Sequence, residues 1–266
     1  MYGGIKPVGL YNCESTRTCE ADSLRALILS DIHSNLEALT AVIDDATERG
    51  GFDSLWCLGD TVGYGPDPGP CIKLLRQHNA LPVLGNHDYV AIGKASAEDF
   101  NYAAKAAIEW TANNLSPEDA KYLSGLPTVI KAEPFTLVHG TLRDHVNEYL
   151  LERDTALATL DLLETRYCAV GHTHLPFICR EDGNKTTFIE FAEDREYNLD
   201  EERLIINPGS VGQPRDRNPR PSYALYDSLE STIQRHRVEY RIQETQEKMR
   251  DVHLPEYLID RLNQGI

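Results

Sequence analysis

Apolar runs that end in polar residues recur along the chain. ALILSD (26–31) is apolar until its last two residues, which is typical of a strand covered on both faces. The apolar residues that follow it repeat at helical spacing: Leu36, Leu39, Val42, Ile43 and Ala46. SLWCLGD (54–60) and ALPVLGNHD (80–88) repeat the strand pattern, with a short helix predicted between them. The first ninety residues therefore predict β-α-β-α-β, a parallel sheet with right-handed crossovers.

Two helical segments interrupt this alternation at residues 99–124, and the second half of the chain is richer in strands. The predicted strands are TVIKA (128–132), FTLVHG (135–140), YCAVGHTH (167–174), LPFICR (175–180), TFIEFA (187–192), LIINPGS (204–210), SYALYD (222–227) and TIQRHRVEY (232–240). Further helices are predicted near 153–164 and at 255–262. We expect one α/β domain over residues 25–266 with a helical insertion near 99–124, preceded by a poorly ordered extension at residues 1–24.

The composition is that of an ordinary soluble protein. The chain has 266 residues, of which 41% are hydrophobic and 26% charged, enough to bury a sizeable core. Its net charge of −16 argues against binding to duplex nucleic acid or to anionic membranes. No apolar stretch approaches the roughly 20 residues of a membrane span. The first 24 residues lack the features of a signal peptide, so we expect a cytoplasmic location. The six cysteines include no CxxC pair, which favours buried free thiols.

Five of the predicted strands end in residue types that bind metal ions. These residues are Asp31 with His33, Asp60, Asn86, His139, and His172 with His174. Loops beyond the carboxyl ends of strands share one crevice in open α/β sheets, so these side chains can converge. A mixed oxygen and nitrogen set suits Mn, Fe or Zn better than Mg or Ca. Seven ligands suit two ions that lie about 3.5–4 Å apart and share one carboxylate. This pattern predicts a dinuclear metallohydrolase.

The same residues lie in five short motifs: DIH (31–33), GD (59–60), GNHD (85–88), HG (139–140) and GHTH (171–174). In this order they resemble the calcineurin-like metallophosphoesterases, over roughly residues 25–228. The stretches 59–71 and 206–227 resemble the compact bacterial and archaeal branch of that family. The resemblance implies a two-sheet αββα sandwich. It also implies hydrolysis of a small phosphodiester or phosphomonoester by a metal-bridging hydroxide.

The resemblance further assigns roles to the candidate ligands. It implies that Asp31, His33 and His174 hold one metal ion together with Asp60. It implies that Asn86, His139 and His172 hold the other, and that Asp60 bridges both ions. We expect two divalent transition-metal ions per chain, with Mn favoured and Fe, Zn or Ni as alternatives.

The neighbours of these ligands have less certain roles. By the resemblance, His87 would stabilise the transition state or protonate the leaving oxygen, and Asp88 would orient it. Alternatively, Asp88 caps the turn that follows. Gly63, Gly65 and Pro66 either shape a turn or contact the substrate.

The substrate class depends on arginines. Ser/Thr protein phosphatases of this superfamily carry arginine in GDxVDRG and RGNHE, whereas this chain has GDTVGYG and LGNHD. The missing arginines count against a protein phosphatase. They favour a phosphodiester, which has one negative charge fewer, unless Arg143 or Arg215 enters the cleft as a substrate-binding residue. A binding scaffold on the same fold is the alternative from another class, and the retention of all seven ligands counts against it.

Overall fold

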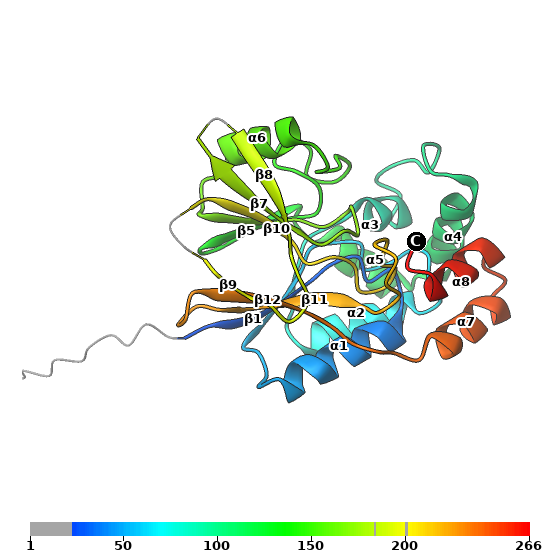
Figure 1. Ribbon diagram of the computed structural model, residues 1–266. Coiled ribbons are helices and arrows are strands. Elements are labelled where there is room, and N and C mark those ends of the chain that lie inside the picture. The colour runs from blue at the N-terminus through cyan, green and yellow to red at the C-terminus, as the bar shows by residue number, and fades with distance from the viewer. Residues whose placement is uncertain (1–22, 184, 200–201) are drawn as a thin grey trace, which may run out of the picture.

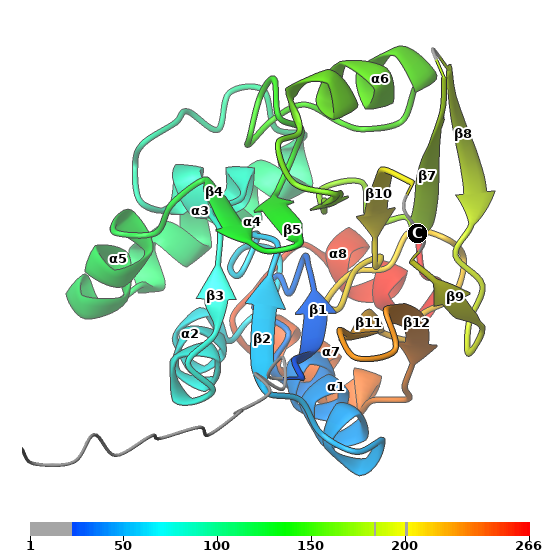
Figure 2. The same cartoon turned by 90° about the vertical axis from the view of Figure 1, so that its left-hand side faces the viewer.

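The computed structural model describes residues 23–183, 185–199 and 202–266. The predicted extension therefore lies almost wholly outside the described residues, as do Cys13 and Cys19. Two six-stranded sheets pack face to face, and helices cover their outer faces (Figures 1 and 2). This confirms the αββα sandwich. Among the described residues, no helix is both long and apolar enough to cross a membrane.

The first sheet is built on the predicted β-α-β-α-β segment. Its strands, in spatial order, are β3 (Leu81–Pro82), β2 (Ser54–Cys57), β1 (Arg25–Leu29), β11 (Ser222–Asp227), β12 (Thr232–Arg237) and β9 (Glu196–Asn198). As predicted, β1, β2 and β3 are parallel, and β11 then pairs antiparallel with β1. Helices α1 (Leu36–Glu48) and α2 (Pro68–Gln77) pack apolar residues on the outer face of this sheet.

The second sheet contains most of the strands predicted in the second half. In spatial order these are β4 (Val129–Ala132), β5 (Phe135–Val138), β6 (Tyr167–Ala169), β10 (Leu204–Asn207), β7 (Phe177–Asp182) and β8 (Lys185–Glu190). Helix α6 (Arg153–Leu162) covers its outer face. Between the sheets lies a core in which Trp56, Phe135 and Tyr226 contact one another.

The remaining helices pack at one end of the two sheets (Figure 1). They are α3 (Asn86–Ala91), α4 (Tyr102–Asn114), α5 (Pro117–Ser124), α7 (Ile242–Asp251), α8 (Glu256–Asp260) and the 3₁₀ helix η1 (Arg261–Asn263). Helices α4 and α5 fall in the predicted helical insertion, and α8 falls in the predicted closing helix.

Two differences between the structure and the sequence predictions concern helices. The run 80–88 is not one strand, because pairing ends at Pro82 and α3 begins at Asn86. The cause is a capping box, in which the Asp88 carboxylate accepts a hydrogen bond from the Gly85 amide at 3.0 Å. Helix α7 was not predicted, because its sequence IQETQEKMRD has too few apolar residues to mark a buried face.

Candidate metal centre

The loops that carry the candidate ligands are hydrogen-bonded to one another beyond the strand ends. The amides of Asp31 and His33 donate to the carbonyls of Gly59 and Asp60, at 3.1 and 2.9 Å. In the second sheet, the Gly171 amide donates to the His139 carbonyl at 2.9 Å. The amide of Gly212 donates to the Asp31 carbonyl at 2.8 Å, which joins the loop after β10 to the same assembly.

Three of the predicted ligands form a first cluster, consisting of Asp31, His33 and His174. The Nε2 atoms of the two histidines lie 3.1 Å apart. Asp31 Oδ1 lies 3.3 Å from His174 Nε2 and 3.9 Å from His33 Nε2. All three side chains are buried, and their ligand atoms are close enough to share one ion.

A second cluster consists of Asn86, His139 and His172. His139 Nε2 lies 3.2 Å from Asn86 Oδ1 and 3.1 Å from His172 Nδ1. The buried carboxylate of Asp60 lies between the two clusters. Its Oδ2 atom is 3.6 Å from His33 Nε2 and 3.4 Å from His139 Nε2. The structure thus brings together all seven predicted ligands, with Asp60 adjoining both clusters.

Each histidine in the two clusters hydrogen-bonds a backbone carbonyl through its outward ring nitrogen. The acceptors are Val62 for His33 at 3.3 Å, Leu58 for His139 at 2.8 Å, Asn147 for His172 at 3.0 Å, and Gln213 for His174 at 2.6 Å. Because a carbonyl can only accept, each outward nitrogen carries the proton. This fixes the tautomer and aims the other nitrogen into the centre, as is usual for histidines that bind metals.

The first cluster has the electrostatics of a cation site. Burial lowers the pKa values of His33 and His174 well below the ordinary range, so both rings are neutral. Their inward nitrogens therefore hold lone pairs, and two lone pairs 3.1 Å apart repel unless a cation lies between them. Beside them, both carboxylate oxygens of Asp31 are buried without a hydrogen-bond partner. Burial raises the pKa of Asp31 to about 7. The residues of this cluster fit a divalent ion.

The pairing of His139 with Asp60 dominates the electrostatics of the second cluster. Burial opposes charge on His139, but the neighbouring Asp60 carboxylate outweighs it and raises the pKa of His139. Burial lowers the pKa of His172 to about 3, so that ring is neutral. Burial would raise the pKa of Asp60, but the neighbouring His139 and His87 outweigh this effect and hold it well below the usual value. A buried carboxylate, an amide oxygen and two imidazoles make a donor set that suits divalent transition metals.

The backbone at the centre is unusually strained. Five of the seven candidate ligands have left-handed backbone conformations, with φ between 49° and 65°: Asp31, His33, Asp60, His172 and His174. Such conformations cost free energy in residues other than glycine, and they cluster at functional sites. Gly85 is required for a related reason, because a Cβ there would lie 2.0 Å from Asp60 Oδ1.

His87 lies at the edge of the centre, and its ring contacts those of His33, Tyr64 and Phe100 at centroid distances of 4.8, 4.4 and 4.7 Å. The Nδ1 atom of His87 is buried and has no hydrogen-bond partner among the described residues. Burial lowers the pKa of His87 to about 4.

The carboxylate of Asp88 accepts from the amides of Val62 and Gly85 at 3.0 Å and of Thr61 at 3.3 Å. These contacts support the alternative role that the sequence left open, in which Asp88 caps the following turn and fixes the backbone after Asp60.

The two candidate substrate-binding arginines differ in position. Arg143 forms an ion pair with Glu148, and its side chain is about half exposed. Arg215 lies beside the first cluster, with Nη2 3.1 Å from Gln213 Oε1 and 3.5 Å from the Tyr64 hydroxyl. Its Nε atom is buried without a hydrogen-bond partner. Arg215 is thus the candidate that has a buried, unsatisfied donor beside the first cluster. Sequence reasoning missed Tyr64, although glycines on both sides of it were a signal.

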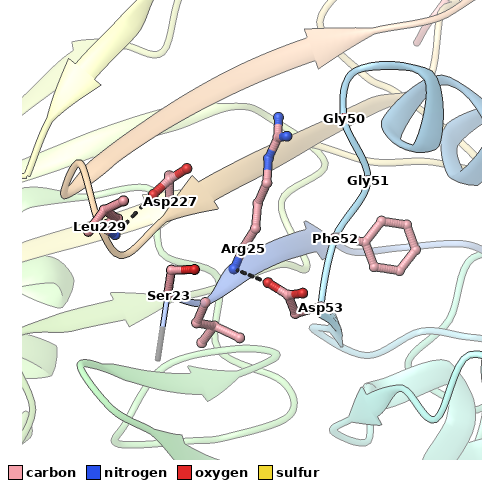
Figure 3. Close-up of a pocket in the computed structure, with 9 residues that line it drawn as sticks. Ser23, Arg25, Gly50, Gly51, Phe52, Asp53, Asp227 and Leu229 are labelled. Atoms are coloured by element: carbon pink, nitrogen blue, oxygen red, sulfur yellow. Dashed lines mark hydrogen bonds between the residues drawn. The ribbon is translucent and has the colours of Figure 1, made fainter. Parts of the chain in front are cut away.

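A separate cavity lies at the other end of β1, where the strand begins (Figure 3). Its lining includes Phe52 and Leu229, together with Arg25, whose backbone amide donates to the Asp53 carboxylate at 2.8 Å. None of the candidate metal-ligand clusters in the described part of the chain lies there. The centre at the strand ends is therefore the candidate functional site.

Comparisons with known proteins identify relatives of this chain. Residues 24–231 match the sequence model of the calcineurin-like phosphoesterase superfamily domain. An uncharacterized protein of Methanocaldococcus jannaschii is 40% identical over 245 residues, which cover 90% of this chain and 97% of that protein. The crystal structure of a metallophosphoesterase from Sphaerobacter thermophilus is similar, with 41% identity and a TM-score of 0.84 over 92% of this chain and 100% of that one. A hypothetical protein from Pyrococcus horikoshii shares the fold, with 21% identity and a TM-score of 0.75 over 91% and 98% of the two chains.

Proposed function

The chain belongs to the calcineurin-like phosphoesterase superfamily, and from this premise we propose that it hydrolyses a small phosphodiester or phosphomonoester at a centre of two divalent ions. One observation carries the proposal. Asp60 Oδ2 lies within 3.6 Å of an inward nitrogen of each cluster, His33 Nε2 and His139 Nε2. A carboxylate in that position could serve two ions, and the three other residues of each cluster would complete the protein ligands of each ion.

When bound, the two ions would supply an activated water as nucleophile and would neutralise the phosphoryl oxygens. The first cluster would hold one ion and the second cluster the other, with Mn the favoured metal and Fe, Zn or Ni as alternatives. The backbone carbonyls behind the four histidines keep the ligand rings in place.

His87 would contribute a hydrogen bond to the transition state. Its pKa of about 4 leaves the ring neutral near pH 7, and nearby metal cations would lower the pKa further. A neutral imidazole still has one N–H that can donate to a phosphoryl or leaving oxygen. It is a poor proton donor, so the structure favours transition-state stabilisation over protonation of the leaving group.

Arg215 would add a positive charge to the phosphate site. In the described ranges its side-chain hydrogen bonds go to Gln213 and Tyr64, neither of which is a carboxylate, although the chain carries a net charge of −16. An arginine beside a metal centre and without a carboxylate partner is suited to bind phosphoryl oxygens. The complete ligand set also counts against a binding scaffold.

A screen of metal-loaded protein against mono-, di- and cyclic phosphates tests this proposal. We expect turnover by the wild type and its loss in Asp60→Asn, which removes the shared charge. Asp161→Asn, a change at an exposed residue of α6, is the matched control and should retain full turnover. Wild-type protein that binds metal but hydrolyses none of these esters would contradict the proposed activity and favour the scaffold.

A further inference from the structure

Tyr64 has an unusual conformation beside the first cluster. Its φ of 56° is left-handed, which is rare for a bulky residue and points to a functional constraint. The side chain is only 7% exposed. Its ring lies against His33 and His87, at centroid distances of 4.6 and 4.4 Å.

The glycines on either side of Tyr64 make this position possible. A Cβ at Gly63, where φ is +95°, would lie 2.4 Å from His87 Nδ1. A Cβ at Gly65 would lie 2.4 Å from the His33 carbonyl oxygen. Any larger residue at either position would displace the backbone from the two histidines. The segment therefore holds the tyrosine ring directly against the candidate metal ligand His33.

The hydroxyl of Tyr64 lies 3.5 Å from Arg215 Nη2. Gln213 anchors the same arginine, since its Oε1 atom lies 3.1 Å from Nη2 and its carbonyl accepts from His174 Nδ1 at 2.6 Å. The buried Nε of Arg215 lacks an acceptor. A hydroxyl and a guanidinium thus lie together at the edge of the first cluster, with donor capacity left for an oxyanion.

The C-terminal helices limit the space on this side of the centre. Tyr64 packs in an apolar cluster with Met249, Leu258 and Leu262. The cavity enclosed by Tyr64, His33, Met249 and Leu262 has a volume of ≈ 10 Å³, which is about the space of one water molecule. The C-terminal helices therefore fill the space behind the Tyr64 ring and hold the ring in place.

We propose that the Tyr64 hydroxyl and the Arg215 guanidinium form an oxyanion subsite that binds the non-bridging oxygens of a terminal phosphoryl group, and that this subsite selects phosphomonoesters. The inference rests on the proposed phosphoesterase function. A monoester dianion has three non-bridging oxygens, which the ions and the subsite can share. The sequence favoured phosphodiesters only as long as neither arginine entered the site, and Arg215 lies beside it.

Two measurements on Mn-loaded protein test the subsite: the dissociation constant of inorganic phosphate, by calorimetry, and the ratio of kcat/KM for p-nitrophenyl phosphate to that for bis-p-nitrophenyl phosphate. Tyr64→Phe keeps the ring and removes only the hydroxyl. Loss of a hydrogen bond to a charged group should weaken phosphate binding about tenfold. It should lower the monoester to diester ratio by a similar factor and leave the metal content unchanged. Arg215→Lys should have a larger effect in the same direction.

The matched control is Tyr197→Phe. Tyr197 is also 7% exposed, but its hydroxyl bonds the Glu190 carbonyl and the Ala192 amide, in the part of the chain between β8 and β9. This control should match the wild type in both measurements. Unchanged phosphate affinity in Tyr64→Phe and Arg215→Lys, with turnover intact, would overturn the subsite and leave the phosphoesterase function standing. Wild-type protein that binds phosphate through these residues without hydrolysing any ester would contradict the function and leave the subsite standing.

Discussion

Replacing Lys248 by methionine tests whether helix α7 supports the first cluster. Lys248 Nζ contacts the carboxylates of Glu37 and Asp67, the latter at 2.9 Å. Thr245 of the same helix has its hydroxyl 2.9 Å from Glu37 Oε2 and 3.1 Å from Asn35 Oδ1. Asn35 is the N-cap of α1, two residues after the candidate ligand His33. This network therefore connects α7 to the loop that carries the first cluster.

The size of the effect follows from burial. Removing one partner of a buried ion pair costs roughly 3–5 kcal/mol, because the remaining charge is left uncompensated. The side chain of Glu37 is 3% exposed, that of Asp67 18% and that of Lys248 34%. Because water screens Lys248 in part, we expect about 2–3 kcal/mol for Lys248→Met. For a protein of this size, that corresponds to a fall in Tm of roughly 4–12 °C.

The assay combines thermal unfolding with metal titration. Lys248→Met should lower Tm by that amount and should weaken the first metal site, because it loosens the helix that contacts Asn35. The second site should keep its affinity. Lys73→Met, at an exposed position on α2, is the control and should change neither quantity. An unchanged Tm, or an equal loss of affinity at both sites, would refute this account of the α7 network.

Two further predictions concern the centre itself. His87→Ala should retain both ions and lower kcat on the order of 10²–10³-fold, the loss typical of one removed transition-state hydrogen bond. The loss should be similar for good and poor leaving groups, whereas a loss confined to poor leaving groups would restore the proton-donor role. Metal affinity should rise from pH 6 to pH 9, with protons released on binding. The reason is that the raised pKa values of Asp31, about 7, and His139, about 9, mean that both must lose a proton before they bind metal. Calorimetry in buffers of different ionisation enthalpy measures this release, and a pH-independent affinity would contradict it.

The sequence predicted those parts of the fold that depend on apolar periodicity. Continuous apolar runs identified β1 and β2, because strands covered on both faces leave no polar positions. The order of the short motifs then predicted the two-sheet sandwich. Helix α7 escaped prediction because its buried positions are Thr245, Gln246 and Met249, of which two are polar. Such residues are buried only because partners distant in the sequence satisfy their hydrogen bonds.

At the centre, residue type predicted the ligands better than it predicted their neighbours. Five motifs at strand ends were enough to predict that seven candidate ligands converge. Residue type alone could not tell whether Arg143 or Arg215 faces the centre. In the structure, Arg143 pairs with Glu148, which lies five residues after it in the sequence. The role of Asp88 was also left open by residue type. A carboxylate three residues after the N-cap glycine is positioned to accept a hydrogen bond from the N-cap amide.

The metal content of the reconstituted protein tests the central claim most directly. Wild-type chain supplied with Mn and freed of excess metal should contain two ions per chain by elemental analysis. His33→Ala should retain one ion, because it removes a ligand of the first cluster only, whereas Asp60→Asn should weaken both sites. A wild-type content of one ion per chain, or an Asp60→Asn variant that still binds two ions with unchanged affinity, would contradict a dinuclear centre bridged by Asp60.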